Sequence, residues 1–186
     1  RGMALTPDAE QFEKVAQLIR NNEIKTLYLT RNGTTTGTDQ KEAIEALVKV
    51  RDASGSDVVI VVDEVSAQWW AASKRTALPD IIFVTSQKDM AIGPGTGLLI
   101  FNNRALERAQ ECAADGLDTG GKLGITAAYG TSKKRMAAEG QTAQTPPLGM
   151  IYAQHLVQDR VLRGAAQQEI RAVQGDALRA ITSSIH

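Results

Sequence analysis

The sequence lacks the features of several common protein classes. It has a single cysteine, Cys112, so it cannot form an intrachain disulfide, and a lone thiol suits a reducing compartment. Basic and acidic residues both number 21, so there is no excess of positive charge for binding nucleic acid or an anionic membrane. No apolar run approaches the roughly 20 residues that span a bilayer. We therefore expect a cytoplasmic protein with neither nucleic acid nor a membrane as its partner.

Both ends of the chain resemble interior positions of a longer protein. The sequence begins at Arg1 without an initiator methionine, and it stops at His186 within a helical pattern. A targeting segment ahead of Arg1, and with it an organellar location, therefore stays open. The 186 residues are enough for one domain with a hydrophobic core of its own.

Strand and helix patterns alternate along the chain. They predict strands over 24–30, 58–62, 81–84 and 98–101, and helices over 6–21, 39–51, 103–114, 148–163 and 165–184. The β-branched run 58–62 is typical of a strand that is buried on both faces of a parallel sheet. Thr38 or Asp39 is the expected N-cap of the second helix. The alternation predicts an α/β fold with three layers, in which helices flank a mostly parallel sheet.

A lysine follows the third predicted strand. Lys88 ends the tetrapeptide 85–88, which lies between the apolar run 80–84 and the glycine-rich segment 93–97. A lysine amine that is removed from water loses its proton more easily and can then attack carbonyl groups. Taken alone, Lys88 is more simply interpreted as a solvated loop residue than as a reactive amine. The residues that lie near it in the fold distinguish these two interpretations.

Two other polar residues follow strands of the same predicted sheet. Thr34 comes after the first strand, and Asp63 ends the second. Because ligands bind at the carboxyl ends of parallel strands, we expect Thr34, Asp63 and Lys88 to face one crevice. A lysine that forms a Schiff base, a carboxylate opposite a ring nitrogen and a hydroxyl near a phenolic oxygen suit pyridoxal 5'-phosphate. The segment 93–97 lacks the Gly-Lys-Ser/Thr ending of a P-loop, and we interpret it as a turn.

Four segments form a set of motifs in a fixed order. They are Asn-Gly-Thr-Thr-Thr-Gly at 32–37, Val-Val-Asp-Glu-Val-Ser at 61–66, Ser-Gln-Lys at 86–88 and a segment ending in Thr-Pro-Pro at 140–147. This set resembles the motifs of the class V aminotransferases, which are fold-type I pyridoxal-phosphate enzymes. Gly33 stands where the family usually has an acidic residue. The order of the motifs matches along nearly the whole chain, so together they are specific.

The resemblance implies roles for the residues that match the motifs. Lys88 would hold the aldehyde of pyridoxal phosphate as a Schiff base and would move the proton during catalysis. Asp63 would pair with the pyridinium nitrogen, and Thr34 would bond the phenolic oxygen. No metal is expected at this site.

The resemblance also implies contacts at the edge of the cofactor and between subunits. Val65 would pack beneath the ring, and Gln87 would contact the phosphate. Gln144 and Thr145 would reach across a dimer interface to the cofactor phosphate of the partner. These last contacts imply a homodimer with shared active sites.

The same resemblance implies what the chain is part of and what it would act on. Residues 1–186 would be a partial pyridoxal-phosphate-binding large domain, without the N-terminal segment and the C-terminal small domain of the family. The substrates would be a small amino acid, serine or alanine, and a 2-oxo acid such as glyoxylate or pyruvate. Gln87 stands where cysteine desulfurases usually carry histidine, which argues against desulfuration. A phosphoserine aminotransferase is the alternative enzyme, and a truncated, inactive fragment or dimerisation module is the alternative outside catalysis.

Overall fold

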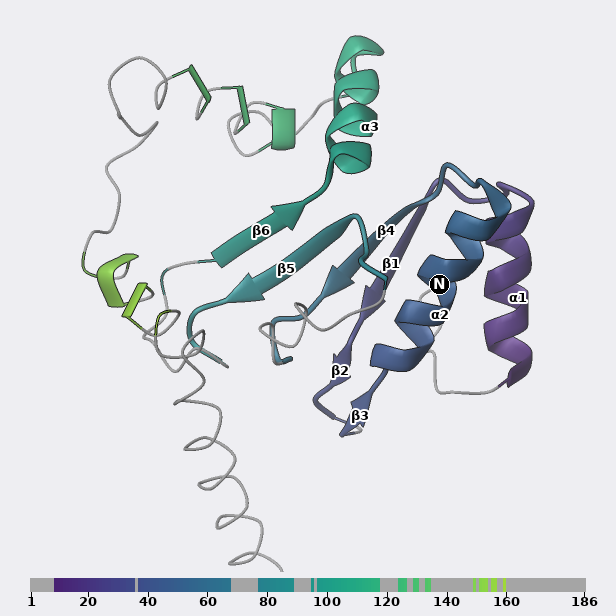
Figure 1. The fold of residues 1–186 in the computed structure, drawn as a ribbon, viewed down its shortest axis with the longest axis horizontal. Helices are drawn as coiled ribbons and strands as arrows, with labels where there is room; N and C mark the ends of the chain where they lie inside the picture. Colours follow the sequence, from purple (N-terminus) through teal and green to yellow (C-terminus); the bar gives the residue numbers. More distant parts are fainter. Residues whose placement is uncertain are drawn as a thin grey trace, which may run out of the picture.

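The structure, a computed structural model, describes residues 9–35, 37–67, 77–88, 95, 97–117, 124–126, 129–130, 133–134, 149, 151–153, 155–156 and 159. Figure 1 shows the elements in chain order: α1 (Ala9–Arg20), β1 (Thr26–Thr30), β2 (Asn32–Gly33), β3 (Thr38–Asp39), α2 (Lys41–Ser54), β4 (Val59–Asp63), β5 (Ile81–Thr85), β6 (Gly97–Phe101) and α3 (Asn103–Ala114). No helix of this described part is long and apolar enough to cross a membrane.

A four-stranded sheet with the order β1-β4-β5-β6 forms the centre of the fold. Strands β1, β4 and β5 are parallel, and β6 runs antiparallel to β5 at the edge. The expected α/β fold with a mostly parallel sheet is confirmed. Thr85, the last residue of β5, lies beside Gly97, the first residue of β6. The carboxyl ends of the three parallel strands therefore share one edge of the sheet with the start of β6.

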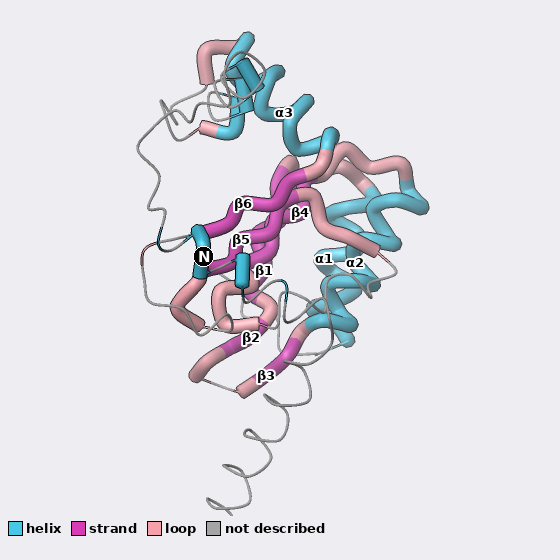
Figure 2. The backbone as a smooth tube through the Cα atoms, turned by 60° about the vertical axis from the view of Figure 1, so that its left-hand side comes forward, coloured by secondary structure: helices cyan, strands magenta, loops and turns pink. Residues whose placement is uncertain are grey.

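One face of the sheet packs against α1 and α2, which form a helical layer on one side of the strands (Figure 2). The residues at this contact are buried and apolar: Val15, Ala16, Ile19, Leu29, Ile44, Leu47, Val48, Val58, Ile60 and Val62. Because side chains alternate along a strand, Leu29 enters this core while Tyr28 and Thr30 point to the other face. In β4 the residues of both faces are buried, as predicted from its β-branched run.

The start of α2 differs from the prediction. Gln40 is the N-cap, so neither Thr38 nor Asp39 takes the expected position. Thr38 and Asp39 instead form β3, which pairs with β2 in an antiparallel hairpin where the sequence indicated only a loop. Asp39 Oδ1 still accepts a 3.0 Å hydrogen bond from the backbone N–H of Lys41. The carboxylate thus satisfies one of the unpaired N–H groups of the first turn.

Asp80 connects several elements at the opposite edge of the sheet. Its side chain is fully buried and accepts hydrogen bonds from Arg51 of α2, from the backbone N–H of Ile60 at 2.8 Å and from Asn102 Nδ2 at 2.8 Å. Asn102 is also the N-cap of α3, because its Oδ1 accepts the backbone N–H of Ala105 at 3.0 Å. One buried carboxylate therefore links α2, β4, β5 and the start of α3.

The predicted strands correspond to β1, β4, β5 and β6, with ends shifted by at most two residues. The helix predicted over 103–114 has these bounds as α3. The helix predicted over 148–163 lies only partly within the described residues, and the one over 165–184 lies outside them. The three described residues 151–153 are helical.

Candidate functional site

Two of the three expected residues lie at or just after the ends of neighbouring strands. Asp63 is the last residue of β4 and lies between Thr30 of β1 and Phe83 of β5. Strand β5 ends at Thr85, and the turn that follows leads to Lys88. Thr34 follows β1 and lies in the turn between β2 and β3. All three therefore belong to the edge at which the parallel strands end.

The Asp63 carboxylate is held from two sides. Its Oδ1 accepts a 2.9 Å hydrogen bond from the backbone N–H of Val65, and its Oδ2 accepts a 3.1 Å hydrogen bond from Tyr28 Oη. The side chain is half-buried, so it remains accessible to a ligand. Burial, the negative charge of Asp63 and the hydrogen bond to it raise the pKa of Tyr28, which keeps the phenol protonated as a donor.

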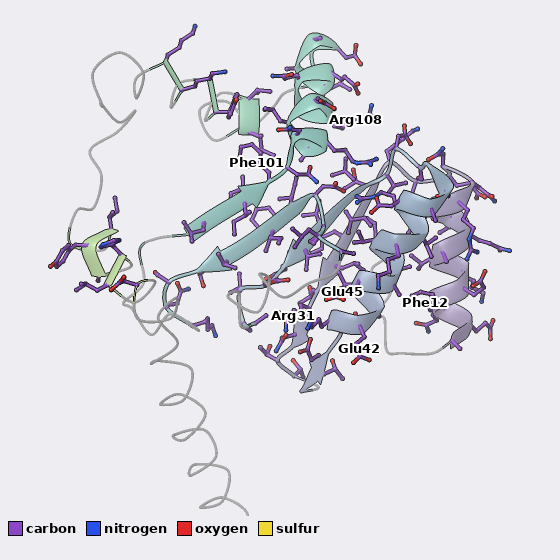
Figure 3. The ribbon with its side chains drawn as sticks, viewed as in Figure 1. Phe12, Arg31, Glu42, Glu45, Phe101 and Arg108 are labelled. Carbon is purple, nitrogen blue, oxygen red and sulfur yellow. The ribbon has the colours of Figure 1, made fainter. Side chains whose placement is uncertain are left out.

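A buried arginine connects the Thr34 hairpin to the end of β4. Arg31 is labelled in Figure 3, below the ends of the strands. Its Nε and Nη2 bond the two carboxylate oxygens of Asp39 at 3.1 and 3.3 Å, and its Nη1 lies 3.7 Å from Glu64 Oε2. Burial raises the pKa of Asp39, but the hydrogen bonds from Arg31 and from the backbone of Lys41, with their charges, outweigh burial and place that pKa below its usual range. Arg31 therefore sets where the hairpin that holds Thr34 lies relative to Asp63.

The main chain strengthens the same connection. The backbone N–H of Arg31 donates to the Asp63 carbonyl at 2.9 Å, and the Arg31 carbonyl accepts the backbone N–H of Gln40 at 2.9 Å. The hairpin turn itself is closed by a 2.7 Å hydrogen bond from the Gly37 N–H to the Gly33 carbonyl. Gly37 has a φ of +67°, a conformation that favours glycine.

Gln87 and Lys88 are both exposed. The removal of water that the sequence suggested for Lys88 is therefore not seen in the structure, because the turn after β5 carries the side chain past the end of the buried strand. A bound molecule, or residues outside the described ones, would have to exclude water from the amine. Gln144 and Thr145 lie outside the described residues.

A buried hydroxyl without a partner lies at the end of β5. Thr85 Oγ1 is inaccessible to solvent and has no hydrogen-bond partner among the described residues. By the alternation along β5, Thr85 shares a face with Phe83, which lies beside Asp63.

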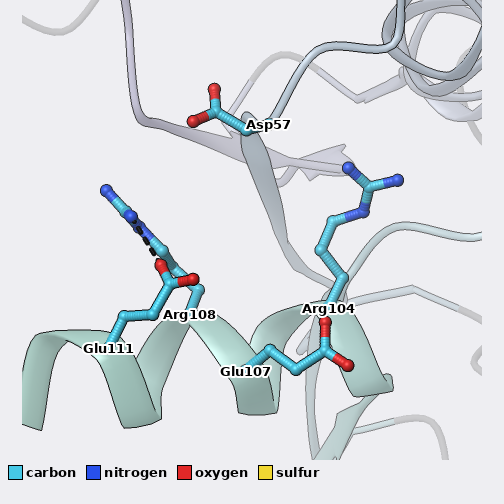
Figure 4. A pocket seen from close by; sticks show the side chains of 5 residues that line it. All are labelled: Asp57, Arg104, Glu107, Arg108 and Glu111. Carbon is cyan, nitrogen blue, oxygen red and sulfur yellow. Dashed lines mark hydrogen bonds and ion pairs between the residues drawn. The ribbon is translucent and has the colours of Figure 1, made fainter.

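Two cavities lie at the opposite edge of the sheet, away from the strand ends. One has a volume of about 340 Å³ and is lined by charged residues, Asp57, Arg104, Glu107, Arg108 and Glu111 (Figure 4). Arg108 is paired with Glu111 at 2.8 Å, and Arg104 donates to the Ser56 carbonyl at 2.9 Å. The other, of about 330 Å³, is mostly apolar and lies beside Pro79 and Ile100. Neither is lined by the residues that the sequence singled out.

Sequence reasoning missed three residues of this region. Tyr28 lies two residues before the exposed Thr30 in β1, so both side chains point to the same face of the sheet. This is the face on which the Tyr28 hydroxyl meets Asp63. Arg31 directly follows β1, and Glu64 directly follows β4. Their opposite charges could have suggested an ion pair between neighbouring parallel strands. The signal was present, but only the strand order β1-β4 shows that these two residues meet.

A curated protein resembles part of this chain. The chain is 28% identical over 146 residues to a serine–glyoxylate aminotransferase of Methylorubrum extorquens, an alignment that covers 77% of this chain and 34% of the relative. The chain thus spans about a third of the length of that curated relative. No family model matches the sequence.

Solved structures show the same architecture. A phosphoserine aminotransferase of Cytophaga hutchinsonii superposes with a TM-score of 0.57 at 22% identity, over 75% of this chain and 37% of that one. An alanine–glyoxylate aminotransferase of Nostoc sp. gives a TM-score of 0.56 at 20% identity, over 84% and 38%. A ureidoglycine–glyoxylate aminotransferase of Bacillus subtilis gives 0.55 at 17% identity, over 83% and 38%. The chain therefore resembles the class V aminotransferases in sequence and has the fold of aminotransferases along the part that it covers.

Proposed function

We propose that this chain is the cofactor-binding part of a pyridoxal-phosphate-dependent aminotransferase. The proposal rests on the positions of Asp63, Lys88 and the Thr34 hairpin, which lie at or just after the carboxyl ends of three adjacent parallel strands. Similarity to a serine–glyoxylate aminotransferase supports it independently.

The polar groups at this edge fit pyridoxal phosphate by their chemistry. The exposed amine of Lys88 could react with the aldehyde of the cofactor. The half-buried carboxylate of Asp63 could pair with the protonated ring nitrogen. When bound, the cofactor supplies an electron sink that stabilises negative charge at the α-carbon of an amino acid.

Each residue then has a defined task. Lys88 would hold the aldehyde of the cofactor and would move the proton at the α-carbon of the substrate. Asp63 would keep the ring nitrogen protonated, and the hydrogen bond from the Val65 N–H fixes its carboxylate for this task. Thr34 would bond the phenolic oxygen and so restrain the ring.

Further residues would bind the rest of the cofactor. Val65 would pack beneath the ring, and Gln87 would bind the phosphate. The proposal assigns Gln144 and Thr145 to the phosphate bound by a second copy of the chain, which would make the enzyme a homodimer with shared active sites.

The reaction we propose moves an amino group from serine or alanine to a 2-oxo acid such as glyoxylate or pyruvate. The relative from Methylorubrum extorquens supports this choice, because its name gives serine and glyoxylate. The phosphoserine aminotransferase is a structural neighbour with a TM-score of 0.57, against 0.56 for the alanine–glyoxylate enzyme, so the fold does not discriminate between these substrates.

The test uses the complete protein that contains this chain. After addition of pyridoxal phosphate, borohydride reduction and peptide mapping are expected to find the reduced cofactor on Lys88, and Lys88→Ala is expected to abolish transamination of serine and alanine. Lys49→Ala is the matched control, because Lys49 is an exposed lysine on α2. Reduced cofactor on another lysine, or full transaminase activity of Lys88→Ala, would show that the assignment is wrong. Cofactor binding without transamination of any amino acid would favour the inactive module instead.

A further inference from the structure

Tyr28 contacts the candidate cofactor site although no motif includes it. It lies in the middle of β1, beside Val61, two residues before Thr30, which lies beside Asp63. Its side chain points to the face opposite the α1–α2 core and reaches along the strand to Asp63. The donor and acceptor, Tyr28 Oη and Asp63 Oδ2, are 3.1 Å apart.

The two carboxylate oxygens of Asp63 have different partners. Oδ1 accepts from the Val65 N–H, which belongs to the turn that follows β4, and Oδ2 accepts from Tyr28, which belongs to the neighbouring strand. Donors on different segments fix the rotation of the carboxylate about its own bond, which neither could do alone. The backbone donor cannot be removed by mutation, whereas the phenol can.

The phenol also occupies one of the two carboxylate oxygens. Tyr28 Oη donates its hydrogen bond to Oδ2 of Asp63, which leaves that oxygen with fewer free lone pairs. Any third donor at Oδ2, such as a protonated ring nitrogen, would share that oxygen with the phenol. The phenol itself is 58% exposed as a residue, so its ring lies open on the face where a ligand would bind.

We propose that Tyr28 is a positioning residue of this site, which orients the Asp63 carboxylate and moderates its interaction with the ring nitrogen of bound pyridoxal phosphate. The inference rests on the proposed function. The inference goes beyond the proposed function because it assigns a role to Tyr28, a residue of β1 that lies outside the four motifs.

The first measurement is cofactor affinity in a double-mutant cycle. In the complete protein, Tyr28→Phe keeps the ring and removes only the hydroxyl, and we expect it to weaken pyridoxal phosphate binding by about tenfold, the size of one hydrogen bond to a charged group. In an Asp63→Asn background the same change is expected to have little effect, because there is no carboxylate left to orient. A purely structural role would weaken binding equally in both backgrounds, and that result would overturn the proposal.

Tyr152→Phe is the matched control, because Tyr152 is 65% exposed and none of its atoms takes part in the contacts around Asp63. It is expected to leave cofactor affinity unchanged. A loss of affinity in Tyr152→Phe that equals the loss in Tyr28→Phe would also contradict the proposal.

A second measurement needs no cofactor. The ultraviolet titration of the tyrosines, taken as the difference between the parent protein and Tyr28→Phe, isolates Tyr28. Because burial and Asp63 raise the pKa of Tyr28, Asp63→Asn is expected to shift this titration to lower pH. An unchanged titration would show that the pair does not form, and the inference would fail. Absence of cofactor binding by the parent protein would instead reject the proposed function, whatever the titration shows.

Discussion

At the scale of single residues, Arg31 is the charge on which the candidate site depends most. It is 4% exposed and lies between the Asp39 carboxylate and Glu64, which is 1% exposed. Paired buried charges add little net stability, but removing one member leaves the other without compensation in a medium of low polarity. Loss of Arg31 would leave Glu64 buried without this cation. Arg31 also ties the hairpin that holds Thr34, through Asp39, to the end of β4, through Glu64.

Arg31→Met is expected to lower the free energy of unfolding by about 3–5 kcal/mol, because Glu64 would stay buried without this cation. Denaturation in urea, followed by circular dichroism, measures the change. Adding Glu64→Gln to Arg31→Met is expected to recover part of the loss. Lys14→Met is the control, since Lys14 and Glu10 form an exposed pair at 2.8 Å that is worth at most about 1 kcal/mol. Equal losses of unfolding free energy in Arg31→Met and Lys14→Met would show that Arg31 and Glu64 do not interact as described.

At the scale of elements, Asp80 determines how helices and strands meet at the edge away from the site. Its carboxylate binds α2 through Arg51, β4 through the Ile60 N–H and the α3 cap through Asn102. One carboxylate can accept these hydrogen bonds together because its two oxygens offer several lone pairs. Strand β5, which leads to Lys88, begins directly after this residue.

Asp80→Ala is expected to lower the melting temperature by on the order of 10 °C, since the loss of a buried partner of Arg51 costs about 3–5 kcal/mol in a chain of this length. Hydrogen exchange should also show a faster Ile60 amide, because its acceptor is gone. The control is Asp52→Ala, which removes the exposed partner of the same arginine at 2.9 Å and is expected to shift melting by only a few degrees. Equal shifts for the two aspartates would contradict the role given to Asp80.

At the scale of the whole molecule, the two faces of the sheet differ. Where the sheet packs on α1 and α2, residues such as Leu47 of α2 (0% exposed) and Ile60 of β4 (0%) have no exposed area. The face that carries Asp63 exposes large apolar side chains: Tyr28 at 58%, Phe83 at 38% and Leu99 at 37%. Among the described residues, the buried apolar area therefore lies mainly between the sheet and these two helices.

Two leucine changes measure this difference. Leu47→Ala is expected to cost about 2–5 kcal/mol of unfolding free energy, because it leaves a cavity in the core. Leu99→Ala, on the exposed face, is expected to cost about 1 kcal/mol or less, because water fills the space it leaves. Denaturant titration of the 186-residue chain compares them directly. Similar losses would show that the Leu99 face is as well covered as the core.

Much of the fold could be predicted because the signals are local. The β-branched run of β4, the alternation in β1 and the helical spacing in α1 and α3 each depend on residues close together in the chain. The prediction of N-cap at Thr38 or Asp39 was wrong because the short β2–β3 pairing takes those residues and moves the cap to Gln40. Roles for Asp63, Lys88, Thr34, Val65, Gln87, Gln144 and Thr145 remain predictions.

Short-range patterns specify the four strands of the central sheet, the α/β class and the positions of Asp63 and Lys88 near the ends of consecutive strands. The antiparallel direction of β6, the exposure of Lys88 and the contacts of Tyr28 and Arg31 depend on the tertiary structure. These features arise between residues that lie far apart in the chain. Tyr28 and Asp63 are 35 positions apart and meet only because β1 and β4 are hydrogen-bonded neighbours, which no pattern within either strand specifies.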